Sequence, residues 1–161
     1  MGKILVTGGL GFIGSNLISM LLKKKYTVLN IDKVTYASNF YNTNEFRYNK
    51  KYKFIKCDLN NQKKLKKIII NFKPDGIFNI AAETHVDRSI DGPKNFIFSN
   101  IIGTFNLLEI IRKYKMKTKL LHISTDEVYG DVIKGRSKET DSYKPSSPRS
   151  EEHTSELQSP C

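Results

Sequence analysis

The chain has 161 residues with 39% apolar composition, which is enough for one domain with a hydrophobic core. The formal charge is +11, but only five of the 27 basic residues are Arg, so we interpret the Lys excess as solvated surface and expect no nucleic-acid partner. With two cysteines, no secretory signal and no apolar run of bilayer length, we expect neither a disulfide framework nor a membrane partner, and we predict a cytoplasmic protein.

Short apolar runs alternate with helical patterns along the chain. The runs predict buried strands at residues 3–7, 27–32, 52–57, 75–81 and 118–124. A helix is expected after the first strand, another at 62–72, and a long one opened by Asp91-Gly-Pro93. This alternation predicts an α/β fold, a Rossmann-type doubly wound parallel sheet truncated after the fifth strand.

Two of the expected helices have apolar residues at helical spacing. After the first strand, the predicted buried stripe is Ile13, Leu17, Met20 and Leu21. On the long helix, the predicted stripe is Phe96, Asn100, Gly103, Leu107 and Ile111. Both helices are therefore expected to pack one face on the sheet.

A glycine motif, "TGGLGFIG", joins the first strand to its helix. It gives a G-x-x-G-x-x-G spacing in which Gly8 allows a sharp turn, Gly11 allows backbone amides to approach a pyrophosphate, and Gly14 allows close helix packing. The helix N-terminus offers unpaired N–H groups to phosphates. The pattern indicates a dinucleotide site; the alternative is a tight glycine turn without a ligand.

Asp32 ends the second predicted strand, 18 residues after Gly14. This is the position of a carboxylate that accepts hydrogen bonds from the adenosine ribose hydroxyls. A negative charge there favours NAD over NADP, although the adjacent Lys33 weakens that preference. Asp58, after the third strand, is expected either to contact adenine or to cap the following helix.

Two adjacent carboxylates follow the fifth predicted strand in "ISTDEVYG". Asp126 and Glu127 repel each other, which favours one protonated and one ionised group, as one acid and one base require. The alternative is a solvated acidic turn. His85 and His122 have no paired ligand spacing, so we expect packing roles for them and no metal.

The motifs together resemble a known family. "ILVTGGLGFIGSN", "NIDKVTYASN", "CDL", "NIAAETHVDRSIDGP", "SNIIGTFNLLE", "HISTDEVYGD" and "YKPSSP" cover residues 1–148 almost continuously. They resemble the extended short-chain dehydrogenase/reductases and, within them, the dTDP-glucose 4,6-dehydratase family. "THVDRSI" and "STDEVYG" best distinguish this family from the related epimerases and decarboxylases, which share the glycine motif but usually lack the Thr-Asp-Glu triplet. The resemblance implies an incomplete NAD-binding Rossmann domain at 1–148.

The resemblance also implies site residues. Together with the three glycines, the NAD contacts would be Phe12, Ile13, Asp32, Lys33, Val34, Thr35, Asp58, Leu59, Ile80, Ala81, Ala82, Glu83, Thr84 and Ser99. Thr84 and Thr125 would contact the substrate, Asp126 would donate a proton and Glu127 would accept one.

The implied reaction is a dehydration with an internal redox loop, using NAD as cofactor. It would convert dTDP-glucose to dTDP-4-dehydro-6-deoxyglucose, with a nucleotide sugar as the small-molecule partner and a homodimer, through the long helix, as the assembly of the full-length enzyme. Two alternatives stay open. One is a UDP-sugar dehydratase or epimerase of the same superfamily, and the other is an NAD-binding chain without catalysis.

The chain departs from the family after Pro148. The family has a Tyr-x-x-x-Lys pattern there, where Tyr is the base for the sugar C4 hydroxyl; this chain has Arg149 and His153 at the two positions. Residues 1–148 contain 22 Lys and 18 Ile, whereas 149–161 contain neither. The codons for this tail resemble a sequencing adapter, so we hypothesise that 149–161 is a non-native, disordered segment on an inactive fragment.

Overall fold

The computed structural model describes residues 2–84, 93–130, 132 and 135–146. His85, the expected helix opening at Asp91-Gly92 and the segment 149–161 lie outside these residues. The described residues form two compact units, one within 2–81 and 102–123, the other within 82–101 and 124–146. The first unit contains the whole sheet.

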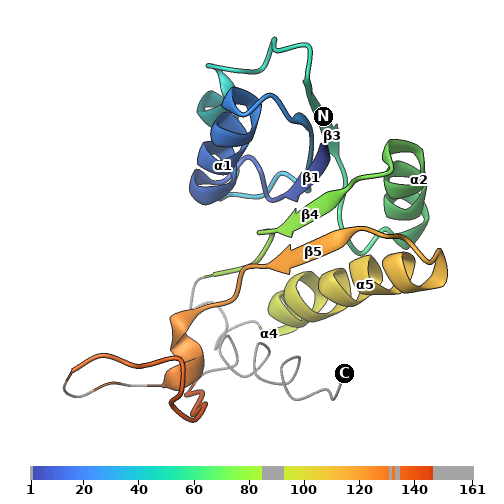
Figure 1. Cartoon of the computed structure of the whole chain (residues 1–161). Coiled ribbons are helices and arrows are strands. Elements are labelled where there is room, and N and C mark those ends of the chain that lie inside the picture. Colours follow the sequence, from blue (N-terminus) through green and yellow to red (C-terminus); the bar gives the residue numbers. More distant parts are fainter. Residues whose placement is uncertain (1, 85–92, 131, 133–134, 147–161) are drawn as a thin grey trace. The chain divides into compact units, whose positions relative to one another are not determined.

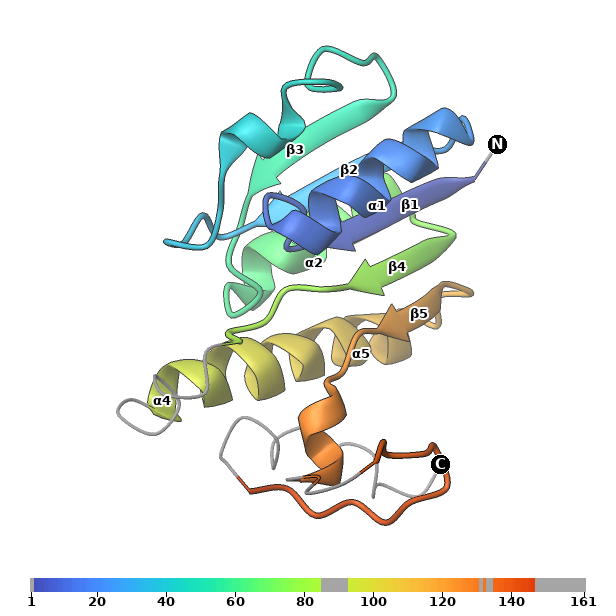
Figure 2. The ribbon, with the colours of Figure 1, turned by 90° about the vertical axis from the view of Figure 1, so that its left-hand side faces the viewer.

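The sheet has five parallel strands in the order β3-β2-β1-β4-β5 (Figure 2). They are β1 (Lys3–Thr7), β2 (Thr27–Asp32), β3 (Tyr52–Lys56), β4 (Gly76–Asn79) and β5 (Lys119–His122). The predicted parallel Rossmann-type sheet is confirmed. β4 is shorter than the expected 75–81, because the amides of Ile80 and Ala81 donate to the Thr7 hydroxyl instead of continuing the ladder.

Helices cover both faces of the sheet. Helix α1 (Phe12–Lys23) lies on one face, and α2 (Gln62–Phe72) and α5 (Gly103–Lys113) lie on the other (Figure 1). One core cluster joins α1 to the sheet through Ile18, Leu21 and Leu22. The other joins α2 and α5 to the opposite face through Leu65, Ile69, Leu107 and Ile110.

The predicted buried stripe of α1 is right for Leu17 and Leu21, which pack in the core, and wrong for Ile13 and Met20. Ile13 is 60% exposed and Met20 is 58% exposed, and the buried residues are Gly14, Ser15, Ile18, Leu21 and Leu22. The cause is Gly14, where a Cβ would meet the Gly8 carbonyl oxygen and lie 2.7 Å from the Gly9 Cα. The side of α1 that carries Gly14 must therefore face the turn. Ile18, Leu21 and Leu22 lie on the same side of the helix and are buried in the core.

The long helix is interrupted. It comprises α4 (Pro93–Phe96), a π-helical segment η2 (Ile97–Ile102) and α5. Its predicted stripe is confirmed, since Phe96, Asn100, Gly103 and Leu107 are buried and Ile111 packs against the core. Two short 3₁₀ helices, η1 (Phe40–Thr43) and η3 (Asp126–Tyr129), complete the elements. Across the described ranges, no helix combines the length and apolar character that a bilayer crossing requires.

Candidate cofactor site and catalytic turn

The glycine turn has open space beside Gly11, whereas backbone atoms lie close to Gly8 and Gly14. Gly8 has φ +69°, and a Cβ there would lie 2.8 Å from the Ala81 Cα, so only glycine fits. At Gly11 the nearest heavy atom to a Cβ would be the Gly8 carbonyl oxygen at an ordinary 3.4 Å. The space next to Gly11 is therefore open, as a pyrophosphate site requires.

The N-terminus of α1 offers hydrogen-bond donors at the same place. Gly11 is the N-cap residue, no side chain caps the helix, and its first turn has no acidic residue. The first N–H groups of a helix have no intrahelical acceptors and carry partial positive charge. Phe12, 81% exposed, and Ile13 add apolar surface beside these donors. An anion with an apolar attachment fits this arrangement.

Asp32 ties the glycine turn to the loop after β2. Its Oδ2 accepts from the Leu10 amide at 3.1 Å, and its Oδ1 accepts from the Val34 amide at 2.8 Å and the Ser38 hydroxyl at 2.9 Å. A carboxylate has about four acceptor sites, so one remains for a ribose hydroxyl. Sequence reasoning predicted the ribose contact but not these structural bonds.

Val34 adopts φ +62°, a left-handed conformation that β-branched residues rarely adopt. Such strain costs about 1–2 kcal/mol and needs surrounding bonds to hold it. The bond from its amide to Asp32 is one of them. Strain concentrated here, between Asp32 and Thr35, agrees with a ligand-contacting role for this loop.

A hollow of about 450 Å³ opens at the carboxyl ends of β2 and β3. Its lining is Lys33, Val34, Thr35, Lys56, Cys57, Asp58, Asn61 and Lys64. Four of these residues are expected cofactor contacts, so the structure brings together positions from two separate sequence segments. Burial raises the pKa of the Cys57 thiol, with Asp58 adding to the effect and Lys64 opposing it.

Asp58 does not cap the following helix. The Asn61 side chain accepts from the Lys64 amide at 3.0 Å and caps α2, whereas Asp58 Oδ1 accepts from the amide and side-chain nitrogen of Asn60. The capping alternative is therefore wrong, and the exposed Asp58 carboxylate faces the hollow. The Leu59 side chain is buried, so only its backbone is available to a cofactor.

The segment after β4 is held by side chains from other elements. The Ile80 and Ala81 amides both donate to the Thr7 hydroxyl oxygen at 3.1 Å. In the second unit, the Glu83 amide donates to Asn100 Oδ1 at 2.8 Å, and Asn100 Nδ2 donates to the Glu83 carbonyl at 3.0 Å. The sequence did not predict that Thr7 and Asn100 support this segment. The only indication is that both polar side chains are buried in the structure and therefore need hydrogen-bond partners.

The remaining members of the expected binding segments also lie in the second unit. Ala82 is half-buried, Thr84 is exposed, and Ser99 is half-buried within η2.

The Thr-Asp-Glu turn forms the start of η3 in the second unit. The Thr125 hydroxyl oxygen accepts from the Glu127 amide at 3.3 Å and caps this short helix. Asp126 is exposed, whereas Glu127 Oε2 is buried without a hydrogen-bond partner among the described residues. The two carboxylates therefore have different environments, as an acid and base pair requires.

The segment before Pro145 packs back on this turn. The Lys144 amide donates to the Val128 carbonyl at 2.9 Å, and the rings of Tyr129 and Tyr143 are 5.5 Å apart. Loss of water contact raises the pKa of Tyr129, and Tyr143 adds to the effect together with two nearby acidic residues. Tyr143 and Lys144 of the "YKPSSP" motif thus support the turn, which spacing in the sequence did not indicate.

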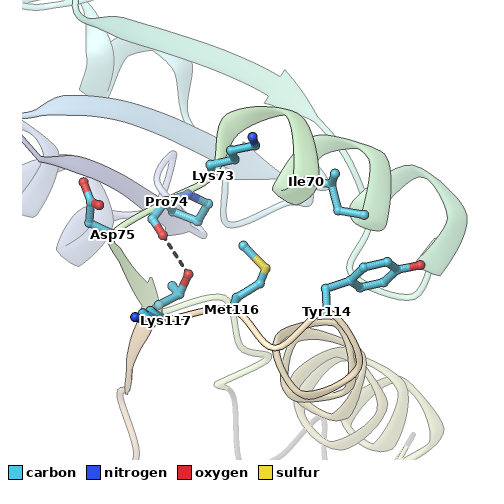
Figure 3. A pocket seen from close by; sticks show the side chains of 8 residues that line it. Ile70, Lys73, Pro74, Asp75, Tyr114, Met116 and Lys117 are labelled. Atoms are coloured by element: carbon cyan, nitrogen blue, oxygen red, sulfur yellow. Dashed lines mark hydrogen bonds between the residues drawn. The ribbon is translucent and has the colours of Figure 1, made fainter.

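A second hollow, of about 370 Å³, lies at the amino ends of the strands (Figure 3). Ile70 of α2 and Lys73, which follows α2, lie across it from Tyr114 and Met116, which follow α5. No expected site residue lines it, and cofactors of such sheets bind at the opposite edge. Within the described part of the chain, no group of three His, Cys, Asp or Glu side chains is arranged for a metal ion.

Comparison with known proteins identifies the family. A family model described as GDP-mannose 4,6 dehydratase matches residues 5–151. The chain belongs to this family. A relative named dTDP-glucose 4,6-dehydratase, from Salmonella typhimurium, is 42% identical over 92% of this chain and 46% of its own length. The chain thus spans about half the length of the curated relatives it matches, and the expected resemblance to these dehydratases is confirmed.

Solved structures of family members agree. The dTDP-glucose 4,6-dehydratase of Bacillus anthracis, in complex with NAD, has a TM-score of 0.82 and 38% identity over 94% of this chain and 47% of that one. DesIV, the dTDP-glucose 4,6-dehydratase of Streptomyces venezuelae with NAD and TYD bound, has a TM-score of 0.86 and 34% identity over 94% and 48%. This chain therefore has the same fold as the matching half of these dehydratases.

Proposed function

We propose that the protein binds NAD at the carboxyl edge of its sheet. The pyrophosphate would lie against Gly11 and the uncapped first turn of α1, and the adenosine ribose would bond to the free acceptor site of Asp32. The observation that carries this proposal is the open space at Gly11 beside unpaired helix donors. The NAD complexes of similar structures support it.

We propose further that the full-length enzyme dehydrates dTDP-glucose to dTDP-4-dehydro-6-deoxyglucose. NAD would supply a hydride acceptor for C4, whose ketone acidifies the C5 proton, and after loss of water the hydride would return to C6 as a proton returns to C5. Glu127 would remove that proton and Asp126 would protonate the leaving C6 hydroxyl, while Thr125 would bond to the C4 oxygen. The unpartnered, buried Oε2 of Glu127 supports its role as the base.

With Arg149 and His153, the present sequence favours NAD binding without turnover. Arg cannot act as a base near neutral pH, and the imidazole of His153 is not the ammonium group of the family's Lys. We expect the 161-residue chain to bind NAD and to form no 4-keto-6-deoxy product. Product from purified chain, detected by mass spectrometry with dTDP-glucose and, separately, UDP-glucose, would contradict this and would identify the nucleotide.

The expected homodimer would use the outward face of α5. Phe105 and Leu108 of α5 are 55% and 47% exposed, and Ile102, which directly precedes α5, is 37% exposed; three neighbouring large apolar side chains are rarely left in water together. Burying such a face against a second copy would remove them from water. Sedimentation of the chain at several concentrations tests this assembly.

We expect the protein to act in the cytoplasm, since Cys57 is a free thiol.

A further inference from the structure

Asn79 lies at the end of β4, fully buried, and its side chain contacts three other elements of the first unit. Its Oδ1 accepts from the Thr7 hydroxyl of β1 at 2.7 Å. Its Nδ2 lies 3.1 Å from the Thr104 hydroxyl of α5 and 3.0 Å from His122 Nδ1 of β5. A buried carboxamide with all of these contacts is satisfied in only one orientation.

The backbone fixes that orientation. The Thr7 hydroxyl oxygen accepts from the amides of Ile80 and Ala81, which occupy both of its acceptor sites. Its proton must therefore be donated, and the acceptor is Asn79 Oδ1. The nitrogen of the carboxamide then faces Thr104 and His122, with one hydrogen for each.

The same reasoning determines the tautomer of His122. Because Asn79 Nδ2 is a donor, His122 Nδ1 must accept and cannot carry a proton. The neutral ring then has its proton on Nε2. The tautomer of a histidine in β5 is thus set by two backbone amides that follow β4.

These amides belong to the segment that packs on the glycine turn. A Cβ at Gly8 would lie 2.8 Å from the Ala81 Cα, so a small shift of Ala81 changes the turn. We propose that Asn79 is a positioning residue, which holds the Ile80–Ala81 backbone against Gly8 and fixes the His122 tautomer. Its effect on cofactor affinity rests on the proposed NAD function.

The test combines nitrogen NMR, amide exchange and NAD titration on the 161-residue chain. In the unmutated protein we expect His122 as the Nε2–H tautomer. In Asn79→Asp, the carboxylate still accepts from Thr7 but can no longer donate to His122, so a proton is expected on Nδ1 while Ala81 exchange stays slow. In Asn79→Leu, we expect at least tenfold faster Ala81 exchange and about tenfold weaker NAD binding.

The control variant is Ile4→Val, a small core change on the opposite, α1-covered face of the sheet, which is expected to leave the tautomer and the Ala81 exchange rate unchanged. An Nδ1–H tautomer in the unmutated protein, or unchanged Ala81 exchange in Asn79→Leu, would overturn the proposal. If Asn79→Leu does not fold, the tautomer in Asn79→Asp decides. Absence of NAD binding by the unmutated chain would refute only the proposed function, because the tautomer and exchange measurements need no NAD.

Discussion

The substitution Gly11→Ala separates the cofactor site from the stability of the fold. Gly11 has φ −75° and ψ 172°, an extended conformation open to any residue, and the added Cβ would be in ordinary contact with the Gly8 carbonyl. Replacing glycine by alanine in a compatible conformation reduces the entropy of the unfolded chain. The free energy of unfolding is therefore expected to rise by about 0.5 kcal/mol.

NAD affinity is expected to change in the opposite direction. The methyl group would occupy the space in which a phosphate approaches the first turn of α1. Losing about two hydrogen bonds to a charged group, at about 1.5 kcal/mol each, corresponds to a Kd roughly 100-fold higher. Calorimetric titration with NAD measures the affinity, and urea unfolding without NAD measures the stability.

Gly14→Ala is the matched comparison, since its Cβ would clash with the backbone of Gly8 and Gly9. It is expected to destabilise the fold by about 1–3 kcal/mol, as overpacking does. The two glycines therefore have different roles in one motif. An NAD affinity within threefold of the original in a folded Gly11→Ala chain would refute the placement of the pyrophosphate at this turn.

Three further outcomes are expected. Asn61→Ala removes the cap of α2 and should lower the free energy of unfolding by about 1 kcal/mol, measured by urea denaturation, with Asn60→Ala showing a smaller loss. Burial raises the pKa of Tyr52 above its ordinary 10.0, so its stabilising effect is complete below pH 10 and is lost as pH rises through the folded-state pKa. Tyr52→Phe should therefore flatten the decline of stability above pH 10; an unchanged slope would contradict the assignment. Phe105→Glu should shift any dimer to monomer in sedimentation, and an unaltered dimer would exclude this face.

The nucleotide sequence beyond codon 148 tests the hypothesis about the tail. A reading frame that continues with Tyr and, four residues on, Lys is expected at this locus. Genomic DNA that encodes 149–161 as given would contradict the hypothesis.

Local sequence determined the strands, the glycine turn and the family. Each strand is a short apolar run next to a turn residue, and Gly8, Gly11 and Asp32 follow fixed spacings that the physical chemistry of dinucleotide binding requires. Such signals do not depend on distant parts of the chain. For this reason the five parallel strands and α2 lie where the sequence placed them, to within a few residues.

Only the tertiary structure decided how these elements are turned and joined. The rotation of α1 follows from the contact of Gly14 with a turn six residues earlier, which hydrophobic spacing does not represent. The early end of β4 and the tautomer of His122 follow from side chains of β1 and α5, distant in sequence. A buried polar group must find partners wherever the fold brings them, so its role depends on packing rather than on its neighbours along the chain.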